Sequence, residues 1–245
     1  MISYNNINNN LNQSRRQECI TIGRLAPDFI GLSTQGYIRL SDYRGKWVVL
    51  ASQPMAFTSV ATTELIEAAQ IYQQLKENNV EYIGLTTDNI YSNLAWIYEI
   101  YQKTGITIPF PIIGDADLVI SELYGMLNPD RLYGITVRDA FIINPQGRIS
   151  AILTLPVSCG RSSEELLRII ASLQITEKYN LHTPANWNPG DPVLEPSPTT
   201  YDELINRVNL EDGSCPFWYV CYTNVPTDNI SAAEQQNISR NQLFI

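Results

Sequence analysis

The feature that most constrains the fold is a regular alternation of short apolar runs with amphipathic segments. The run KWVVLAS at residues 46–52 predicts a buried strand, and residues 62–79 after it have the apolar spacing of a helix. A second strand is predicted over residues 80–87 and a second helix over residues 92–105, with Gly105 at its C-cap. Strands separated by helices of this length predict an α/β sheet that is covered on both faces.

The pattern continues and then adds a hairpin. A strand within residues 110–115 precedes a short helix within residues 116–127. Residues 138–156 divide at the sequence NPQG into two strands, which predicts an antiparallel edge. The next segment predicts a helix with an acidic first turn, where Ser162 or Ser163 can act as the N-cap.

The composition changes after residue 176. Residues 183–200 are rich in proline and predict extended chain, and a small element is expected at residues 201–210. Residues 215–224 contain more aromatic side chains than a solvated tail needs. These changes predict an Asn-rich mobile tail at 1–21, an α/β domain at 22–176, a C-terminal arm at 177–224 and a mobile tail at 225–245.

The composition also argues against several classes of function. A net charge of −9 and a pI near 4.6 disfavour nucleic-acid binding and docking on anionic membranes. No apolar run approaches the ~20 residues of a membrane span, and the N-terminal sequence lacks the apolar core of a secretory signal. We therefore expect a cytoplasmic protein with neither a nucleic-acid nor a membrane partner.

The cysteines and the histidine do not form a metal-binding pattern. Cys19, Cys159, Cys215 and Cys221 are too few and too scattered for a disulfide scaffold. Zinc prefers four nitrogen or sulfur ligands at close spacing, and the single histidine, His182, lies far from most of the cysteines in the sequence. We expect no metal site.

Hydroxyl side chains gather where the strand at residues 46–52 passes into the following helix. This junction runs from Pro54 to Glu64, and its hydroxyls and backbone N–H groups could point at a ligand beside the helix start. The hydroxyl residues are Thr58, Ser59, Thr62 and Thr63. At the centre of this arrangement stands Ala61, whose methyl group has no lone pair for chemistry.

Six motifs of the chain, in their order and spacing, resemble the peroxiredoxin family. They are APDF at 26–29, PMAFTSVATTE at 54–64, FPIIGDAD at 110–117, TVRDAFIINPQG at 136–147, GRSSEELLRII at 160–170 and TPANW at 183–187. The C-terminal region resembles that of the one-cysteine, peroxiredoxin-6-like branch, so that the resemblance covers about residues 22–224. It implies a thioredoxin-like fold with a smaller C-terminal α+β arm, no cofactor, and reduction of hydrogen peroxide and organic hydroperoxides by a peroxidatic cysteine.

The resemblance also implies roles for individual residues. The family motif Pro-x-x-x-Thr-x-x-Cys matches Pro54 and Thr58, and Ala61 stands where the peroxidatic cysteine belongs. By resemblance, Arg138 holds the thiolate and the peroxide oxygens, Thr58 donates its hydroxyl to the same atoms, and Pro54 shields the pocket from water. Such an arginine is needed because an unperturbed thiol, with a pKa of ~8.5, is mostly protonated at neutral pH.

Two further residues complete the site that the resemblance implies. Glu64 matches the glutamate that orients the arginine, and Arg161 matches a second arginine that supports the first. Together they would stabilise the charge that develops as the O–O bond breaks. With Ala61 in place of the nucleophile, we expect no turnover by the family mechanism.

Two explanations of Ala61 stay open. The residue is either an engineered replacement that stops catalysis or traps one conformation, or the mark of a natural relative that lost its activity. Gln53, where this branch usually has histidine, and Ala56, where aspartate is common, favour natural divergence somewhat.

The other cysteines also allow two interpretations each. Cys215 and Cys221 resemble the arm cysteines of archaeal members, which resolve a sulfenic acid formed on a neighbouring subunit, and the alternative is a local disulfide or two packed thiols. Cys159 either approaches the edge of the pocket or is a small buried thiol, which is the commoner case.

Two hypotheses of function follow. The first is a thiol-dependent peroxidase that here lacks its nucleophile, with a peroxide substrate and a thiol reductant such as thioredoxin. The second is an inactive homologue that persists as an oligomeric binding or structural protein. The resemblance predicts at least a homodimer through the C-terminal arm, and allows a ring of dimers.

Overall fold

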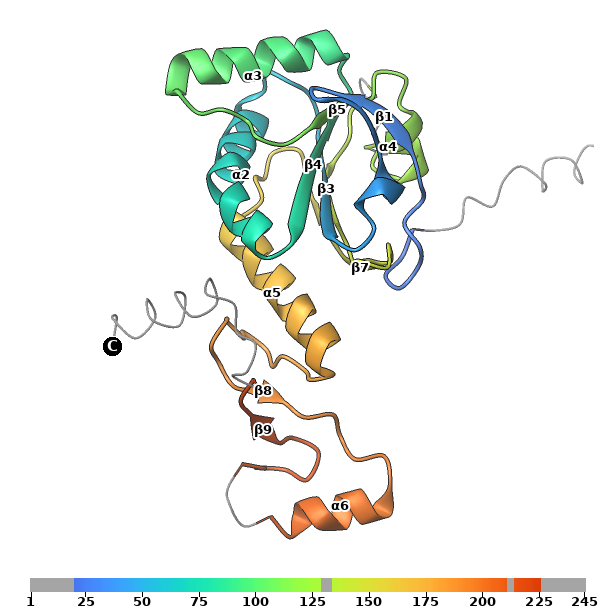
Figure 1. The fold of residues 1–245 in the computed structure, drawn as a ribbon, viewed down its shortest axis with the longest axis vertical. Coiled ribbons are helices and arrows are strands. Elements are labelled where there is room, and N and C mark those ends of the chain that lie inside the picture. Colours follow the sequence, from blue (N-terminus) through green and yellow to red (C-terminus); the bar gives the residue numbers. More distant parts are fainter. Residues whose placement is uncertain (1–19, 129–133, 211–213, 226–245) are drawn as a thin grey trace, which may run out of the picture.

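The computed structural model describes residues 20–128, 134–210 and 214–225. Cys19 and almost all of the tails expected at 1–21 and 225–245 lie outside these described residues. Figure 1 shows an α/β domain and a smaller C-terminal arm, with the long helix α5 (Ser163–Tyr179) leading from one to the other. Among the described residues, no helix is both long and apolar enough to cross a membrane.

The α/β domain is built on a mixed sheet of seven strands in the order β2-β1-β5-β4-β3-β6-β7. β3 is parallel to β4 and β4 to β5, whereas β6 and β7 form an antiparallel edge beside β3, as the NPQG turn predicts. The strands are β1 (Ile30–Ser33), β2 (Gly36–Arg39), β3 (Trp47–Gln53), β4 (Val80–Thr86), β5 (Ile112–Gly114), β6 (Arg138–Ile143) and β7 (Ile149–Leu155).

Helices cover both faces of this sheet. Every residue of β3 is buried, and its alternate side chains enter different cores. Val49 and Ala51 belong to a core with helices α2, α3 and α5, whereas Val48 and Leu50 belong to a core with the N-terminal segment and α4. The predicted α/β sheet with two covered faces is therefore confirmed. The helices of the domain are η1 (Leu40–Tyr43), α2 (Ser59–Glu77), α3 (Ile90–Thr104), α4 (Val119–Leu123) and α5 (Ser163–Tyr179).

Several of the predicted helix ends are confirmed. Gly105 is the C-cap of α3 with φ +72°, a backbone conformation that favours glycine. The side chain of Ser162 caps α5 by accepting a hydrogen bond from the N–H of Glu165. α2 begins at Ser59, earlier than residues 62–79 predict, so that position 61 lies in its first turn.

The C-terminal arm has little core of its own. It contains β8 (Val193–Leu194), α6 (Tyr201–Val208) and β9 (Tyr222–Thr223), and the proline-rich segment before α6 forms only the short strand β8. Ile175 of α5 packs with Trp187 and Val193, which joins the start of the arm to α5. No side chain of α6 is buried in the described part of the arm.

The topology brings several loops to one edge of the sheet. Gln53 at the end of β3 pairs with Thr86 at the end of β4. In the antiparallel pair of β3 and β6, Ala51 lies opposite Ala140, so Arg138 at the start of β6 lies at this same edge. The carboxyl ends of parallel strands are where α/β proteins commonly place their sites.

Candidate active site

Three charged side chains with little exposure meet at this edge. Glu64 on α2 accepts hydrogen bonds at Oε2 from Arg138 Nη1 (2.9 Å) and Arg161 Nη2 (2.8 Å). Its Oε1 accepts from the backbone N–H of Arg161 (2.7 Å) and from Arg161 Nε (3.1 Å). The structure thus joins the three residues that the sequence predicts to act together, although they come from α2, β6 and the loop before α5.

This network is electrostatically unusual because its side chains are almost completely shielded from solvent. The side chains of Arg138, Glu64 and Arg161 are 2%, 5% and 8% exposed. Burial lowers the pKa of Arg138, while the carboxylate of Glu64 opposes this effect. Among these three residues, one carboxylate between two guanidinium groups leaves an excess positive charge, which is suited to stabilise an anion in a site with a low dielectric constant. The buried carboxyl of Asp139 also interacts with Arg161, and burial raises its pKa.

A small cavity lies against this network. Its volume is about 20 Å³, and its lining includes Glu64, Arg161, Tyr82 and Ala68. A cavity of this size has room for one water molecule. Burial raises the pKa of the Tyr82 phenol to about 12, so this hydroxyl keeps its proton at neutral pH.

Ala61 lies in the first turn of α2 and is fully buried. Its methyl group belongs to the core that also contains Ala56 and Trp96. A helix start carries a partial positive charge, which favours an anionic group there. At position 61 this partial charge favours an anion, whereas burial in an apolar core opposes one.

The threonine hydroxyls of this junction donate hydrogen bonds to backbone carbonyls. Thr58 donates its hydroxyl to the carbonyl of Met55 (2.9 Å), and Thr62 donates to the carbonyl of Thr58 (2.8 Å). Thr63 donates to the carbonyl of Val60 (2.8 Å). Each hydroxyl satisfies a carbonyl of the turn or of the first helical turn, a local bond that threonine side chains commonly form.

The loop between β3 and α2 is held by the loop after β4. Pro54 is buried, and its carbonyl accepts a hydrogen bond from the hydroxyl of Thr87 (2.8 Å). The carboxylate of Asp88 accepts from the N–H of Ala56 (2.6 Å). Asp88 was not among the residues expected to shape the site. Its position directly after a predicted strand could have indicated such a role.

Gln53, at the end of β3, also lies at this edge of the sheet. Its side chain is fully buried, and neither its Nε2 nor its Oε1 has a hydrogen-bond partner among the described residues. Buried amides are normally paired, because an unpaired polar group loses its solvation without compensation. The glutamine that stands where this branch usually has histidine therefore leaves a buried, unpaired amide in the structure.

Cys159 and His182 both lie on the surface. Cys159 is a free, exposed cysteine, so the interpretation of a small buried thiol is wrong. It lies in the loop between β7 and α5, close to the ion-pair network. His182 is exposed on the arm, where its backbone pairs with Leu194, and it is not near the network in the sequence or in the sheet.

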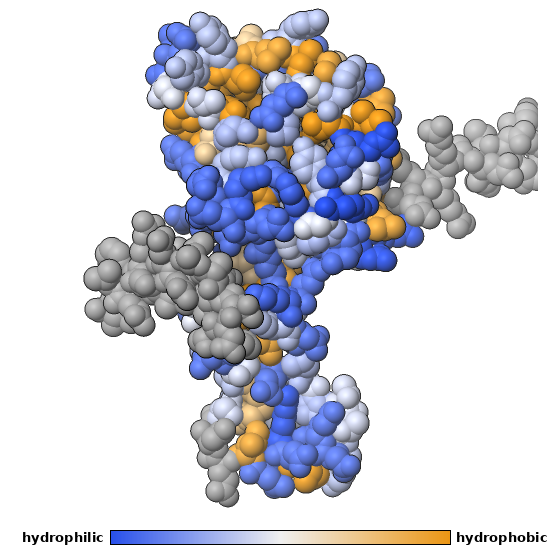
Figure 2. All heavy atoms as spheres, viewed as in Figure 1, coloured by the Kyte–Doolittle hydropathy of each residue, from blue (hydrophilic) through white to orange (hydrophobic). Residues whose placement is uncertain are grey.

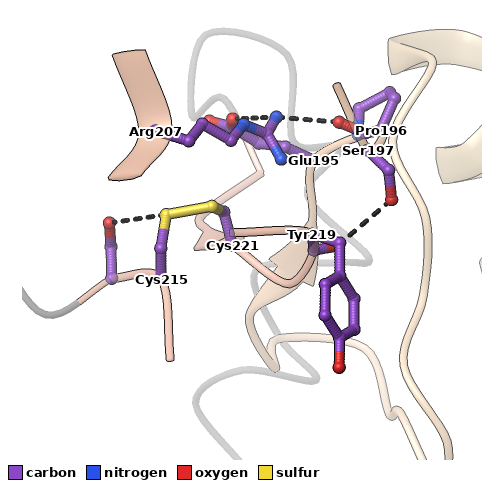
Figure 3. The surroundings of a disulfide bond; sticks show 8 residues. Glu195, Pro196, Ser197, Arg207, Cys215, Tyr219 and Cys221 are labelled. Atoms are coloured by element: carbon purple, nitrogen blue, oxygen red, sulfur yellow. Dashed lines mark hydrogen bonds and ion pairs between the residues drawn. A yellow bond between two sulfur atoms is a disulfide. The ribbon is translucent and has the colours of Figure 1, made fainter. Parts of the chain in front are cut away.

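Cys215 and Cys221 form a disulfide with each other in the arm, as Figure 3 shows. This is the local disulfide that the sequence left open as an alternative. The carbonyl of Cys221 accepts from the N–H of Glu195 (3.0 Å), and Glu195 in turn pairs with Arg207 (2.9 Å). Within residues 20–128, 134–210 and 214–225, no group of three or more His, Cys, Asp or Glu residues is placed to hold a metal ion.

Comparison with known proteins agrees with this geometry. Residues 22–152 match the model of the AhpC/TSA family, and residues 172–209 match the C-terminal domain of 1-Cys peroxiredoxin. Peroxiredoxin 2 of Caldanaerobacter subterraneus subsp. tengcongensis is 50% identical over 205 residues, which cover 83% of this chain and 93% of that protein. A peroxiredoxin of Thermoplasma volcanium is 43% identical over 201 residues, which cover 82% of this chain and 97% of that protein.

Solved structures show the same similarity. A yeast mitochondrial 1-Cys peroxiredoxin, solved to explain its thiol resolving mechanism, superposes with a TM-score of 0.74 at 33% identity, covering 83% of this chain and 99% of that chain. A mutant of the peroxiredoxin 6 of Arenicola marina gives a TM-score of 0.76 at 33% identity, covering 85% and 99%. The fold is thus thioredoxin-like, and the chain belongs to the peroxiredoxin family, whose members are thiol-dependent peroxidases.

Proposed function

We propose that Arg138, Glu64 and Arg161, together with the start of α2, form a peroxidase pocket whose nucleophile is replaced by Ala61. The observation that carries this proposal is the almost fully buried network with its excess positive charge, at the sheet edge where α2 begins. A preorganised charge of this kind stabilises the oxyanion that leaves when a peroxide bond breaks. Because a methyl group cannot attack a peroxide, this chain does not turn over peroxide through residue 61.

Each residue of the pocket then has a distinct role. Arg138 binds the peroxide oxygens, Glu64 orients Arg138, and Arg161 holds Glu64 from the other side. Pro54 excludes water from the pocket, in accord with its burial. Thr58 is the residue whose role needs a rearrangement, because its hydroxyl must leave the carbonyl of Met55 to reach a substrate.

The same site predicts the reaction of a variant that has cysteine at position 61. Its substrates are hydrogen peroxide and organic hydroperoxides, and a thiol such as thioredoxin reduces the oxidised enzyme. Cys215 and Cys221 are the candidate resolving thiols, and they can act only after their mutual disulfide is reduced. We also propose the cytoplasm as the place of this chemistry.

A second candidate function is oligomeric binding without catalysis. The arm exposes a cluster of large apolar side chains, with Phe217 56%, Trp218 43% and Tyr219 47% exposed. Figure 2 shows further apolar side chains on the α/β domain around α3. Exposed aromatic clusters of this kind mark interaction surfaces, and the arm cluster supports a homodimer that a ring of dimers could extend.

Restoring the nucleophile tests which of the two proposed functions is correct. In a background with Cys159→Ser, Ala61→Cys is expected to consume hydrogen peroxide with dithiothreitol as the reductant, whereas Ala61→Ser is expected to consume none. If Ala61→Cys folds, as its circular dichroism would show, and consumes no more than Ala61→Ser, the peroxidase pocket is refuted and binding becomes the function to test.

A further inference from the structure

The exposed aromatic cluster of the arm lies entirely within the loop that the disulfide closes, Cys215–Cys221, which we call the arm loop. Between the two cysteines stand Phe217, Trp218 and Tyr219. The rings of Phe217 and Tyr219 stack with their centroids 5.4 Å apart, and Trp218 meets Tyr219 edge to face at 5.2 Å. In Figure 3 the ring of Tyr219 points away from the disulfide. One covalent bond thus frames the surface of the proposed dimer.

Hydrogen bonds add to the disulfide in holding the arm loop. The N–H of Tyr222 donates to the carbonyl of Ser214 across the ends of the loop (2.9 Å). The hydroxyl of Ser197 donates to the carbonyl of Tyr219 at an exposed place (3.1 Å). Bonds of this kind contribute little net stability, because water competes for the same groups. The disulfide is therefore the strongest link of the loop, and its loss lets the loop sample many more conformations.

The two sulfur atoms of the disulfide differ in their access to solvent. Cys215 is partly exposed, whereas Cys221 is only 2% exposed and its carbonyl accepts from the N–H of Glu195 (3.0 Å). A thiol from solution can therefore reach the sulfur of Cys215 and displace that of Cys221. Disulfides of cytoplasmic proteins are usually transient and serve catalysis or redox sensing. In the proposed compartment this bond is thus suited to open and close with the redox state.

We propose that the Cys215–Cys221 disulfide is a redox switch for self-association, which fixes the arm loop for dimerisation when oxidised and releases it when reduced. The inference rests on the proposed function, because it requires the dimer through the arm. The partner that the cluster binds is a second copy of this chain. The sequence CPFWYVC has no charged side chain, so two chains of net charge −9 can meet there with little repulsion. Because the closed loop is already ordered, it loses less conformational entropy on binding than an open loop.

The switch exchanges two electrons and two protons. In the reduction, a thiolate from solution attacks the sulfur of Cys215, the S–S bond breaks, and Cys221 leaves as a thiolate that takes up a proton. A second thiol then attacks the mixed disulfide at Cys215. Both cysteines end as thiols, and the two solution thiols end as one disulfide. Oxidation is the reverse exchange with a small-molecule disulfide.

The test measures the dissociation constant of the dimer of the full chain in both redox states by sedimentation equilibrium. The background is Cys19→Ser/Cys159→Ser, because these two thiols could otherwise cross-link two chains. Dithiothreitol gives the reduced form and oxidised glutathione the oxidised form, and mass spectrometry after alkylation with iodoacetamide verifies each. We expect reduction to raise the dissociation constant at least about tenfold, since ordering two or three freed side chains at an interface costs about that much affinity.

The matched control is Cys215→Ser/Cys221→Ser in the same background, whose arm loop is open under both conditions. Its dissociation constant should equal that of the reduced chain and should not respond to dithiothreitol. A response as large as that of the chain with both cysteines would overturn the inference, because the effect would then arise elsewhere.

The same measurement separates this inference from the dimer on which it rests. Equal dissociation constants for the oxidised and the reduced chain would overturn the switch and leave the dimer standing. If the oxidised chain is a monomer at micromolar concentration, the arm dimer itself is refuted, and the switch with it.

Discussion

Arg138 Nη1 donates to Glu64 Oε2 at 2.9 Å across 74 residues of sequence, and both side chains are almost fully buried. This contact fixes the start of β6 to the first turns of α2. The fold and the candidate site therefore depend on the same ion pair. Its removal should be visible in stability as well as in chemistry.

Replacing Glu64 by Gln removes the only carboxylate of this network. Arg138 and Arg161 then lose their counter-charge in a buried place, which we expect to reduce the free energy of unfolding by about 3–5 kcal/mol. Urea denaturation followed by circular dichroism measures the change. Glu67→Gln, at an exposed position of the same helix, is the control and should change stability by less than about 0.5 kcal/mol. Similar values for the two variants would show that the network is not needed for stability.

Glu81 gives a prediction for pH dependence. Burial alone would raise the pKa of its carboxyl, but hydrogen bonds and charges from Lys46 and Lys76 outweigh burial and lower it. A folded-state pKa below the unfolded one contributes stability above the unfolded pKa, and this contribution is lost as the pH falls through the folded pKa.

Glu81→Gln should therefore lower the melting temperature at pH 7 and have a much smaller effect at pH 3. Thermal denaturation at both pH values, with Glu99→Gln at an exposed position of α3 as the control, measures the difference. An equal loss at the two pH values would mean that packing, rather than charge, explains the effect of the substitution.

The disulfide between Cys215 and Cys221 should stabilise the arm locally. It closes a short loop in a part of the chain that has little core, and the loss of such a cross-link costs about 2–3 kcal/mol on the chain-entropy account. Cys215→Ser/Cys221→Ser should speed amide hydrogen exchange in β8 and β9 and leave β3 and β4 unchanged. Unchanged exchange in β8 and β9 would show that the arm does not need the cross-link.

The aromatic cluster of the arm predicts self-association. Sedimentation equilibrium should give the mass of a dimer, or of a multiple of a dimer, of the 27.7 kDa chain. Phe217→Ser/Trp218→Ser should weaken the dimer by at least about tenfold, because buried aromatic anchors contribute about 2 kcal/mol or more at interfaces. Tyr37→Ser on β2, where the side chain is 77% exposed, should leave the mass unchanged. A monomer at micromolar concentration would rule out the arm dimer.

The sequence predicts the central sheet because its strands are buried on both faces and read as continuous apolar runs, as in β3. It does not predict the hairpin of β1 and β2, because β1 buries Gly31 and Ser33 rather than its apolar side chains and no residue of β2 is buried. The start of α2 at Ser59 was missed because serine and threonine are poor helix formers that here bond to the backbone.

The site residues also divide into those that could be predicted from the sequence and those that could not. Arg138, Glu64 and Arg161 could be predicted together only from the resemblance, since they are distant in sequence and meet through the topology of the sheet. The exposure of Cys159 and the hydroxyl partners of Thr58 could not be predicted, because both depend on the path of a loop. Asp88 likewise acquires its role from a contact between two loops.

The most direct test of the pocket compares two introduced thiols. In a background with Cys159→Ser, Ala61→Cys places a thiol in the buried first turn of α2, and Ser59→Cys places one on the exposed side of the same turn. The measurement is the single-turnover rate of each thiol with hydrogen peroxide. We predict a rate at least about 100-fold higher at position 61, because only there can Arg138 act as a preorganised donor. Equal rates at the two positions would contradict the account.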